Sequence, residues 1–95
     1  MKIKLKIYGF PRLNQIIGGK KVDIEFEGTT ARDLICELIK IYGSEVHRII
    51  LDKNMHLNSN MRWLKNGNQW ITDEDLDTEL MDGDIIVLSL LVTGG

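Results

Sequence analysis

The chain has 95 residues, which suits a single domain, and 43% of them are apolar and 27% charged, as in soluble globular proteins. A formal net charge of −2 leaves no basic excess to neutralise phosphates, so nucleic acid is not expected as a partner. The lone cysteine excludes an internal disulfide. No apolar run reaches the roughly 20 residues of a membrane span, and the first residues lack the apolar core of a signal peptide. We therefore expect a cytoplasmic protein with no membrane partner.

Two segments in the first third alternate between apolar and charged residues. Residues 3–7 alternate isoleucine and leucine with lysine, and residues 22–26 alternate apolar residues with aspartate and glutamate. A period of two predicts half-buried strands, and an antiparallel pairing would set the lysine row beside the acidic row. Pro11 and Gly18-Gly19 predict a loop between them. We expect a hairpin connection there, because the glycines and following lysines lack the full pattern of a phosphate-binding loop.

A helix is predicted over residues 30–42. Leucine and isoleucine recur there at helical spacing, and charged residues occupy the opposite face. Thr30 is a candidate N-cap with Asp33 three residues later, close to a capping box, and Gly43 is a natural C-terminal stop. Residues 44–60 begin with a short apolar run and continue with polar turn residues, which predicts a short helical turn or strand followed by a loop.

The last third of the chain predicts strands joined by tight turns. Residues 61–66 suit one strand, Asn66-Gly67 is a strong turn signal, and residues 69–71 can return as a short strand. After an acidic connection, residues 85–92 are apolar at all but one position. Such a run suits a central strand covered on both faces, or one whose apolar face awaits a partner. Helix and strands are segregated, so the predicted fold class is α+β, and a last strand beside the first would run parallel to it.

The sequence ends in Gly94-Gly95. Glycine has no Cβ, so such an arm can enter a narrow channel in another protein. The terminal carboxyl group has a reference pKa near 3.5 and is ionised at neutral pH. It is therefore a poor electrophile that needs activation, usually as an acyl-adenylate, and this sequence contains no recognisable ATP site. The simpler alternative is a solvated chain end.

Several short motifs in the last third of the chain occur together. They are Asn66-Gly67, Leu76-Asp77-Thr78, Leu80, Asp82-Gly83-Asp84, the apolar last strand and Gly94-Gly95. In this combination the chain resembles, over nearly its whole length, the MoaD and ThiS family of ubiquitin-like sulfur carriers. The resemblance implies a β-grasp fold, with a mixed sheet of four to five strands packed on one main helix. It also implies a domain over residues 1–92 and a flexible tail over residues 93–95.

The resemblance implies a sulfur carrier of the MoaD branch. An E1-like adenylating enzyme would adenylate the carboxylate of Gly95, and a sulfur donor would convert the adenylate to a thiocarboxylate. The length of the chain favours molybdopterin synthesis, in which the large subunit of molybdopterin synthase would use that sulfur for the molybdenum or tungsten cofactor. Gly94 would give narrow access to the partner, and Leu91, Val92 and Thr93 would set the docking of the tail.

On this interpretation the chain is a carrier and co-substrate and not an enzyme. It would bind no metal or cofactor of its own, and ATP would be used by the partner enzyme. Two alternatives use the same activated Gly95: a protein modifier joined to lysines, and a sulfur donor for thiamin synthesis or tRNA thiolation. A third alternative is a binding module whose tail has no role.

The remaining reactive or aromatic residues have structural interpretations. His47 and His56 lack clear third and fourth metal ligands, so we expect exposed polar side chains. Cys36 lies inside the predicted helix, and we expect a buried and inert thiol. Trp63 and Trp70 predict packing in the core or at its rim, or interface anchors if they share an exposed face with the last strand.

Overall fold

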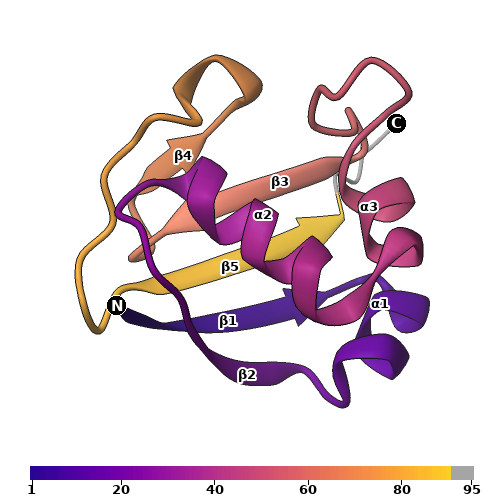
Figure 1. Cartoon of the computed structure of the whole chain (residues 1–95), viewed down its shortest axis with the longest axis horizontal. Coiled ribbons are helices and arrows are strands. Elements are labelled where there is room, and N and C mark those ends of the chain that lie inside the picture. Colours follow the sequence, from indigo (N-terminus) through magenta and orange to yellow (C-terminus); the bar gives the residue numbers. More distant parts are fainter. Residues whose placement is uncertain (91–95) are drawn as a thin grey trace.

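The structure, a computed structural model, describes residues 1–90 and arranges them as a five-stranded sheet with helices against one face (Figure 1). The elements are β1 (Lys2–Tyr8), α1 (Pro11–Ile17), β2 (Lys21–Glu25), α2 (Ala31–Tyr42), α3 (Ser44–Ile50), β3 (Met61–Lys65), β4 (Gln69–Ile71), the 3-10 turn η1 (Asp73–Asp75) and β5 (Ile85–Leu90). The strand order is β2-β1-β5-β3-β4, with β5 parallel to β1 and antiparallel to β3. The predicted α+β class, the mixed sheet and the central last strand are confirmed.

The alternating patterns of the first two strands are confirmed, and they pair antiparallel. The isoleucine and leucine side chains of β1 are at most 1% exposed. On the other face, Lys2 lies opposite Glu25 and Lys4 opposite Asp23, as the predicted charge match requires. The match ends at the third pair, where Lys6 lies opposite Lys21, because β2 begins with a lysine two residues before its first acidic residue, Asp23.

The predicted loop between the first two strands is wrong in part, because it contains helix α1. Pro11 stands in the first turn, where a missing N–H costs no helical hydrogen bond. Gly18 ends the helix with φ +96°, in the left-handed region that glycine tolerates. Leu13 and Ile17, one helical turn apart, are buried. Proline and glycine therefore bracket a short helix here and do not mark irregular chain.

The main helix α2 begins and ends where the sequence predicts. Thr30 Oγ1 accepts from the backbone N–H of Asp33 at 3.2 Å, and Asp33 Oδ2 accepts from the N–H of Thr30 at 3.1 Å, which completes a capping box. The N–H of Gly43 donates to the carbonyl of Ile39 at the other end. Residues 44–50, for which a helical turn or a strand was predicted, form helix α3.

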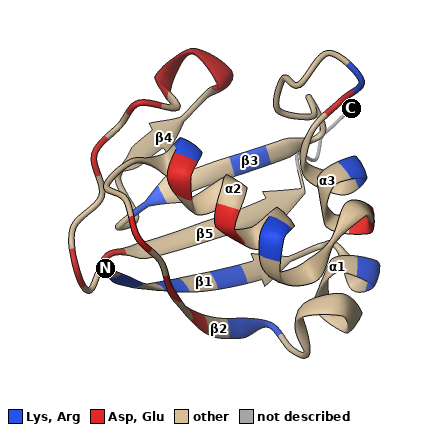
Figure 2. Ribbon diagram, in the orientation of Figure 1, with Lys and Arg blue, Asp and Glu red and all other residues tan. Residues whose placement is uncertain are grey.

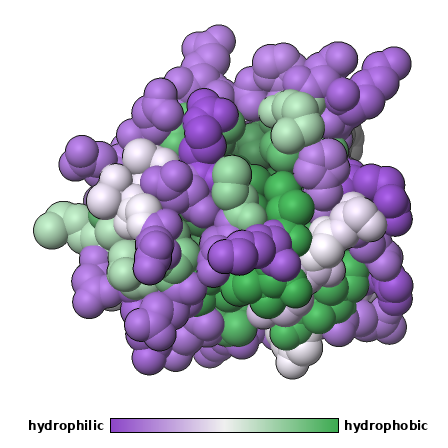
Figure 3. Space-filling view, viewed as in Figure 1, coloured by the Kyte–Doolittle hydropathy of each residue, from purple (hydrophilic) through white to green (hydrophobic). Residues whose placement is uncertain are grey.

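One core lies between the sheet and the three helices. Buried side chains of all three helices join those of the sheet, and Ile86 and Leu88 of β5 are completely buried. Their neighbours Ile85 and Ser89 point to the opposite face and remain partly exposed. Of the two predicted settings for β5, the strand with one uncovered face is the one observed. The helix side, seen in Figure 3, is mostly hydrophilic around an apolar area over α2 and α1.

Candidate functional site

The predicted tail residues lie outside the described part of the chain. They are Leu91, Val92, Thr93, Gly94 and Gly95, together with the predicted boundary between a domain and a tail. What the structure does place is the strand that leads to them, the contacts that hold this strand and the surface around its end.

The last described residue, Leu90, ends β5 between its two neighbouring strands. The parallel strand β1 pairs with β5 as far as Tyr8, which lies opposite Ser89. The antiparallel strand β3 begins at the same level, where Met61 lies opposite Leu90. The chain beyond Leu90 therefore starts from the middle of the sheet, with the end of one strand and the start of another beside it.

Gly9 allows the backbone to approach Leu90 closely at this exit. Its φ of +85° lies in the left-handed region, and a Cβ built on it would stand 2.8 Å from the Cβ of Leu90. Any other residue at position 9 would be strained and would push against Leu90. Gly9 is therefore a positioning residue that the sequence analysis did not single out. Its signal was a glycine directly after an alternating strand.

Two of the motifs behind the family resemblance meet at the start of β5. Asn66 donates through Nδ2 to Oδ1 of Asp84 at 2.9 Å, and the N–H of Met81 donates to Oδ2 at 2.8 Å. Lys65 Nζ lies 3.8 Å from the same Oδ2. Asn66 also accepts, through Oδ1, from the N–H of Ile85 at 2.8 Å. The Asn-Gly turn and the Asp-Gly-Asp turn thus fix where β5 begins.

The carboxylate at the centre of this network is buried, since Asp84 is only 8% exposed. Burial pushes the pKa of Asp84 upward, but hydrogen bonds from Asn66 and Met81 and the charge of Lys65 outweigh burial and hold the pKa below its usual value. The network therefore favours a charged Asp84, and its contribution to stability depends on pH.

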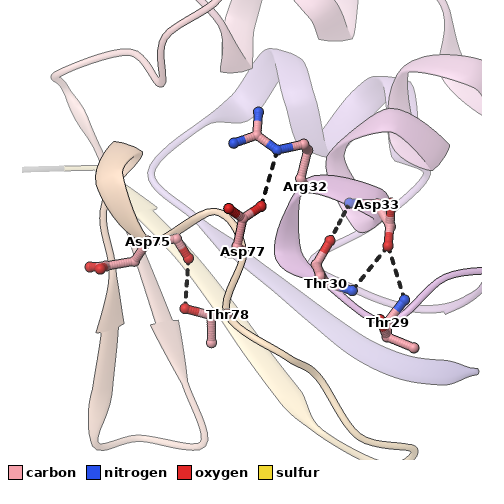
Figure 4. A network of polar contacts seen from close by, with 7 residues as sticks. All are labelled: Thr29, Thr30, Arg32, Asp33, Asp75, Asp77 and Thr78. Atoms are coloured by element: carbon pink, nitrogen blue, oxygen red, sulfur yellow. Dashed lines mark hydrogen bonds and ion pairs between the residues drawn. The ribbon is translucent and has the colours of Figure 1, made fainter.

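A third motif of the resemblance, Leu76-Asp77-Thr78, stabilises the start of α2 (Figure 4). The first N–H groups of a helix have no partner within the helix. Here the carbonyl of Thr78 accepts from the N–H of Ala31 at 3.0 Å, and the carbonyl of Leu76 accepts from that of Arg32 at 2.9 Å. Asp77 Oδ1 lies 3.5 Å from Nε of Arg32. This motif therefore has a structural role.

We call the sheet face opposite the helices the open face; it carries apolar side chains and lysines, and Asp23 and Glu25 lie opposite two of these lysines. One row of side chains crosses all five strands through cross-strand pairs: Lys21, Lys6, Val87, Leu64 and Trp70. The apolar half of this row lies on β5, β3 and β4, and the basic half on β1 and β2. Trp70 is 51% exposed, and Val87 and Leu64 are half-buried. Exposed apolar side chains that lie together can mark an interaction site, so the open face is a candidate docking surface.

Charge is distributed unevenly around the open face. Figure 2 shows lysines along β1 and acidic residues gathered at η1 and in the connection toward β5. Beside the cross-strand row, Tyr8 is 42% exposed, and the guanidinium of Arg62 lies 5.3 Å from the ring centroid of Trp70. A partner surface with apolar and acidic groups would complement this arrangement.

The histidines take part in surface contacts. His56 Nδ1 lies 2.6 Å from Oδ2 of Asp73, whose Oδ1 accepts from the N–H of Leu57 at 2.8 Å. The hydrogen bond to the carboxylate raises the pKa of His56, and the N–H of Leu57 and then His56 lower the pKa of Asp73. His47 contacts the sulfur of Met55. The pair of His56 and Asp73 ties the loop before β3 to η1.

The other candidate residues fall on different surfaces. Cys36 is exposed, so the expectation of a buried thiol is wrong: Ile35 and Leu38 take the core face of α2, and position 36 turns outward. Trp63 is buried at 2% exposure, whereas Trp70 is 51% exposed on the open face. Within residues 1–90, no cluster of three or more His, Cys, Asp or Glu side chains is placed to hold a metal ion, and no helix is long and apolar enough to cross a membrane.

The comparisons with known proteins give structural matches only. No protein-family model matches the sequence, and no curated protein sequence matches it. Among solved structures, small archaeal modifier protein 1 from Methanosarcina acetivorans is similar with a TM-score of 0.76 and 26% identity, over 99% of this chain and 96% of that one. A Pyrococcus furiosus protein described as molybdopterin converting factor subunit 1 is similar with a TM-score of 0.68 and 28% identity, over 97% of this chain and 99% of that one.

A third solved structure, small archaeal modifier protein 1 from Haloferax volcanii, covers 100% of both chains with a TM-score of 0.75, although only 18% of the residues are identical. Together these matches confirm the ubiquitin-like β-grasp fold and the resemblance that the sequence motifs predict. The neighbours include a protein described as a molybdopterin converting factor subunit and others described as modifier proteins, so the shared fold alone does not separate these two uses.

Proposed function

We propose that this ubiquitin-like β-grasp chain is a sulfur carrier for molybdopterin synthesis and that the carboxylate of Gly95 is its working group. In this proposal Gly95 is the carboxyl terminus of the mature protein. Gly94 gives access to a narrow active site, and Leu91, Val92 and Thr93 set the docking of the tail. The chain acts as a co-substrate, and the side chains that catalyse the reactions belong to its partners.

The chemistry follows from the low reactivity of a carboxylate. An E1-like adenylating enzyme joins the Gly95 carboxylate to AMP from ATP and releases pyrophosphate. A donor of sulfide-level sulfur then displaces AMP, so that a C–S bond replaces the C–O bond of the adenylate and a thiocarboxylate is formed. Molybdopterin synthase takes up this sulfur through its large subunit, and water cleaves the bond between the sulfur and the carbonyl carbon of Gly95, which regenerates the carboxylate. ATP is bound by the activating enzyme, and the carrier itself needs no cofactor.

The observation that carries the proposal is the match, over 97% of this chain, to the protein described as molybdopterin converting factor subunit 1. The position of β5 supports it. This strand is central in the sheet and is held at its start by the Asp84 network, so it offers a rigid base for a short reactive arm beyond Leu90. Five further residues reach at most about 18 Å, enough to enter a partner's active site.

A protein modifier is the second candidate function. Three of the similar structures, from two archaea, are described as small archaeal modifier protein 1, and one of them matches with a TM-score of 0.76. A modifier uses the same adenylate of Gly95 but transfers the carbonyl carbon to the amine of a lysine. The two functions therefore differ in the product and not in the activation step.

The test is the mass of the chain and of its conjugates after expression in its own cell. A carrier is expected as an intact protein ending at Gly95, in which one oxygen is replaced by sulfur. Deletion of Gly95 should abolish this product and leave the fold unchanged. C-terminal peptides of this chain joined through Gly95 to lysines of other proteins, without the sulfur-containing form, would establish the modifier instead. A mature chain that extends beyond Gly95 would refute both.

A further inference from the structure

A hollow lies at the open end of the β3–β4 hairpin, away from its turn, and we call it the exit hollow. It is lined by residues 57–59, 61–63 and 70–73 and has a volume of about 280 Å³. Strand β4 ends at Ile71, and the chain turns away at Asp73 to meet His56 and Leu57. The hollow therefore lies where β4 stops and the loop before β3 crosses over, and the bond between His56 and Asp73 joins its two sides.

The exit hollow lies next to the point where the described chain ends. Met61 belongs to its lining and is also the partner of Leu90 in the sheet. Five residues follow Leu90, with a reach of at most about 18 Å. A protein that receives Gly95 in an active site must therefore bring its surface close to this side of the molecule, and the exit hollow lies within that contact zone.

The lining combines apolar surface with a cation, the guanidinium of Arg62. Leu57, Met61, Ile71 and the exposed ring of Trp70 supply the apolar part. Arg62 lies over Trp70, and within residues 1–90 its guanidinium has neither an ion pair nor a hydrogen bond. It is therefore available to an incoming carboxylate.

Among the described residues of the lining, Asp73 supplies the one carboxylate, and this carboxylate already has partners. Asp73 is bound by His56 and by the N–H of Leu57, and it makes no ion pair with Arg62. Arg62 is thus the charged group of this lining that has no partner among residues 1–90. The volume of the exit hollow is just below the roughly 300–1,000 Å³ of small-molecule sites, which suits one or two side chains better than a nucleotide.

We propose that the exit hollow receives an apolar side chain of the adenylating enzyme. In the sequence of that enzyme, the residue next to this side chain is an Asp or Glu, and its carboxylate binds Arg62. This inference rests on the proposed function, because it names the partner as the enzyme that activates Gly95. The apolar side chain packs on Trp70 and Met61, and the carboxylate pairs with Arg62. The tail supplies the reacting group, and the exit hollow supplies affinity for the enzyme.

The experiment measures adenylation of the whole chain by the adenylating enzyme of the same organism, followed as pyrophosphate release while the carrier concentration is varied. Trp70→Ala and Arg62→Glu should each raise the KM for the carrier about tenfold or more, as loss of an interface anchor does, and leave kcat within twofold. Two matched controls on α2, Ile41→Ala (51% exposed, like Trp70) and Lys40→Glu, should keep the wild-type KM.

The wild-type arm separates the two proposals. If the wild-type chain is not adenylated at Gly95, the proposed function fails and this inference fails with it. If the wild-type chain is adenylated and both variants keep its KM while their circular dichroism and urea midpoints match, the exit hollow is refuted and the proposed function stands. Loss of a homodimer in Trp70→Ala, seen by light scattering, would assign the hollow to a second copy and also overturn the inference.

A photo-cross-linking amino acid in place of Trp70 tests the chemistry of the occupant. The cross-linked peptide of the adenylating enzyme should contain an apolar residue next to Asp or Glu. Replacing that acidic residue of the enzyme with arginine should return the KM of Arg62→Glu to the wild-type value, because the ion pair is re-formed with exchanged charges. A cross-linked segment without an acidic residue would refute the predicted pairing.

Discussion

Replacing Asp84 with asparagine tests whether the network at the start of β5 holds the base of the tail. The carboxylate accepts from Asn66 and from the N–H of Met81 and lies 3.8 Å from Lys65 Nζ. Asparagine keeps the shape and one acceptor oxygen but presents an NH₂ group to a second donor. Hydrogen bonds to charged groups contribute about 1.5–3 kcal/mol each, so Asp84→Asn should cost about 2 kcal/mol, or roughly 8–16 °C in Tm for a chain of this size.

The effect should depend on pH with a definite sign. The pKa of Asp84 is lowered in the folded state, so its charge stabilises the fold fully above the unfolded pKa of about 3.9. That stability is lost as pH falls below this value and through the folded pKa. The free-energy difference between wild type and Asp84→Asn should therefore be largest at neutral pH and shrink below about pH 4. Other carboxylates with lowered pKa values are present in both proteins and cancel in the difference.

Urea unfolding monitored by circular dichroism at neutral pH and near pH 3 measures the free-energy cost of Asp84→Asn and its change with pH. Asp77→Asn is the matched control, because Asp77 is exposed and makes only a long surface pair with Arg32, worth at most about 0.5 kcal/mol. The reasoning is refuted if Asp84→Asn costs no more than this control at neutral pH, or if its cost is the same at both pH values.

Three further substitutions test separate parts of the fold. Gly9→Ala should destabilise the protein by about 1–3 kcal/mol, because alanine is strained at positive φ and meets Leu90; it should also slow loading of the tail, and wild-type loading would contradict its positioning role. Thr30→Ala should cost about 1 kcal/mol in urea unfolding through loss of the helix cap, and a cost near zero would show that the cap is dispensable. Asp73→Asn should lower the pKa of His56 measured by NMR titration, and an unchanged pKa would contradict the pairing.

The elements predicted correctly from the sequence are those whose pattern repeats several times. Strands β1 and β2 show a period of two over at least five residues, and α2 combines a long apolar stripe with a cap and a stop. The tight turn at Asn66-Gly67 was equally clear, because both residues adopt positive φ. In each case local preference and burial favour the same structure, so little is left for the tertiary fold to override.

The failures have local physical causes. Helix α1 has seven residues, too few for a clear helical period, and its proline and glycine, which mark its two ends, are equally typical of an irregular loop. The exposure of Cys36 depends on how α2 is rotated about its own axis on the sheet. A rotation by the angle between two successive residues would exchange a core position for an exposed one. The uncovered face of β5 was left open as an alternative, because an apolar run alone does not reveal how many layers cover a strand.

The candidate site was predictable only in part. The resemblance indicates that Gly95 and the residues before it form the functional site. These residues lie outside the described part of the chain, so their chemistry stays a proposal. Gly9 was missed, since its importance comes from a contact with Leu90 that is 81 positions away in the sequence. The exit hollow was also hidden, because residues from the loop before β3 and from both strands of a hairpin form it together.

The motifs that carry the resemblance are structural in the described chain, and this limits where specificity can lie. The Asn-Gly, Asp-Gly-Asp and Leu-Asp-Thr segments position β5 and α2 and contribute no reactive group. A terminal glycine carboxylate is chemically the same in every carrier or modifier that ends in one. Partner choice is a difference in affinity, which a shared reactive group does not supply. On the proposed function, side chains other than the terminal glycine distinguish the partners, and Arg62 and Trp70 are candidates beside the tail residues because they combine an exposed charge with an exposed ring.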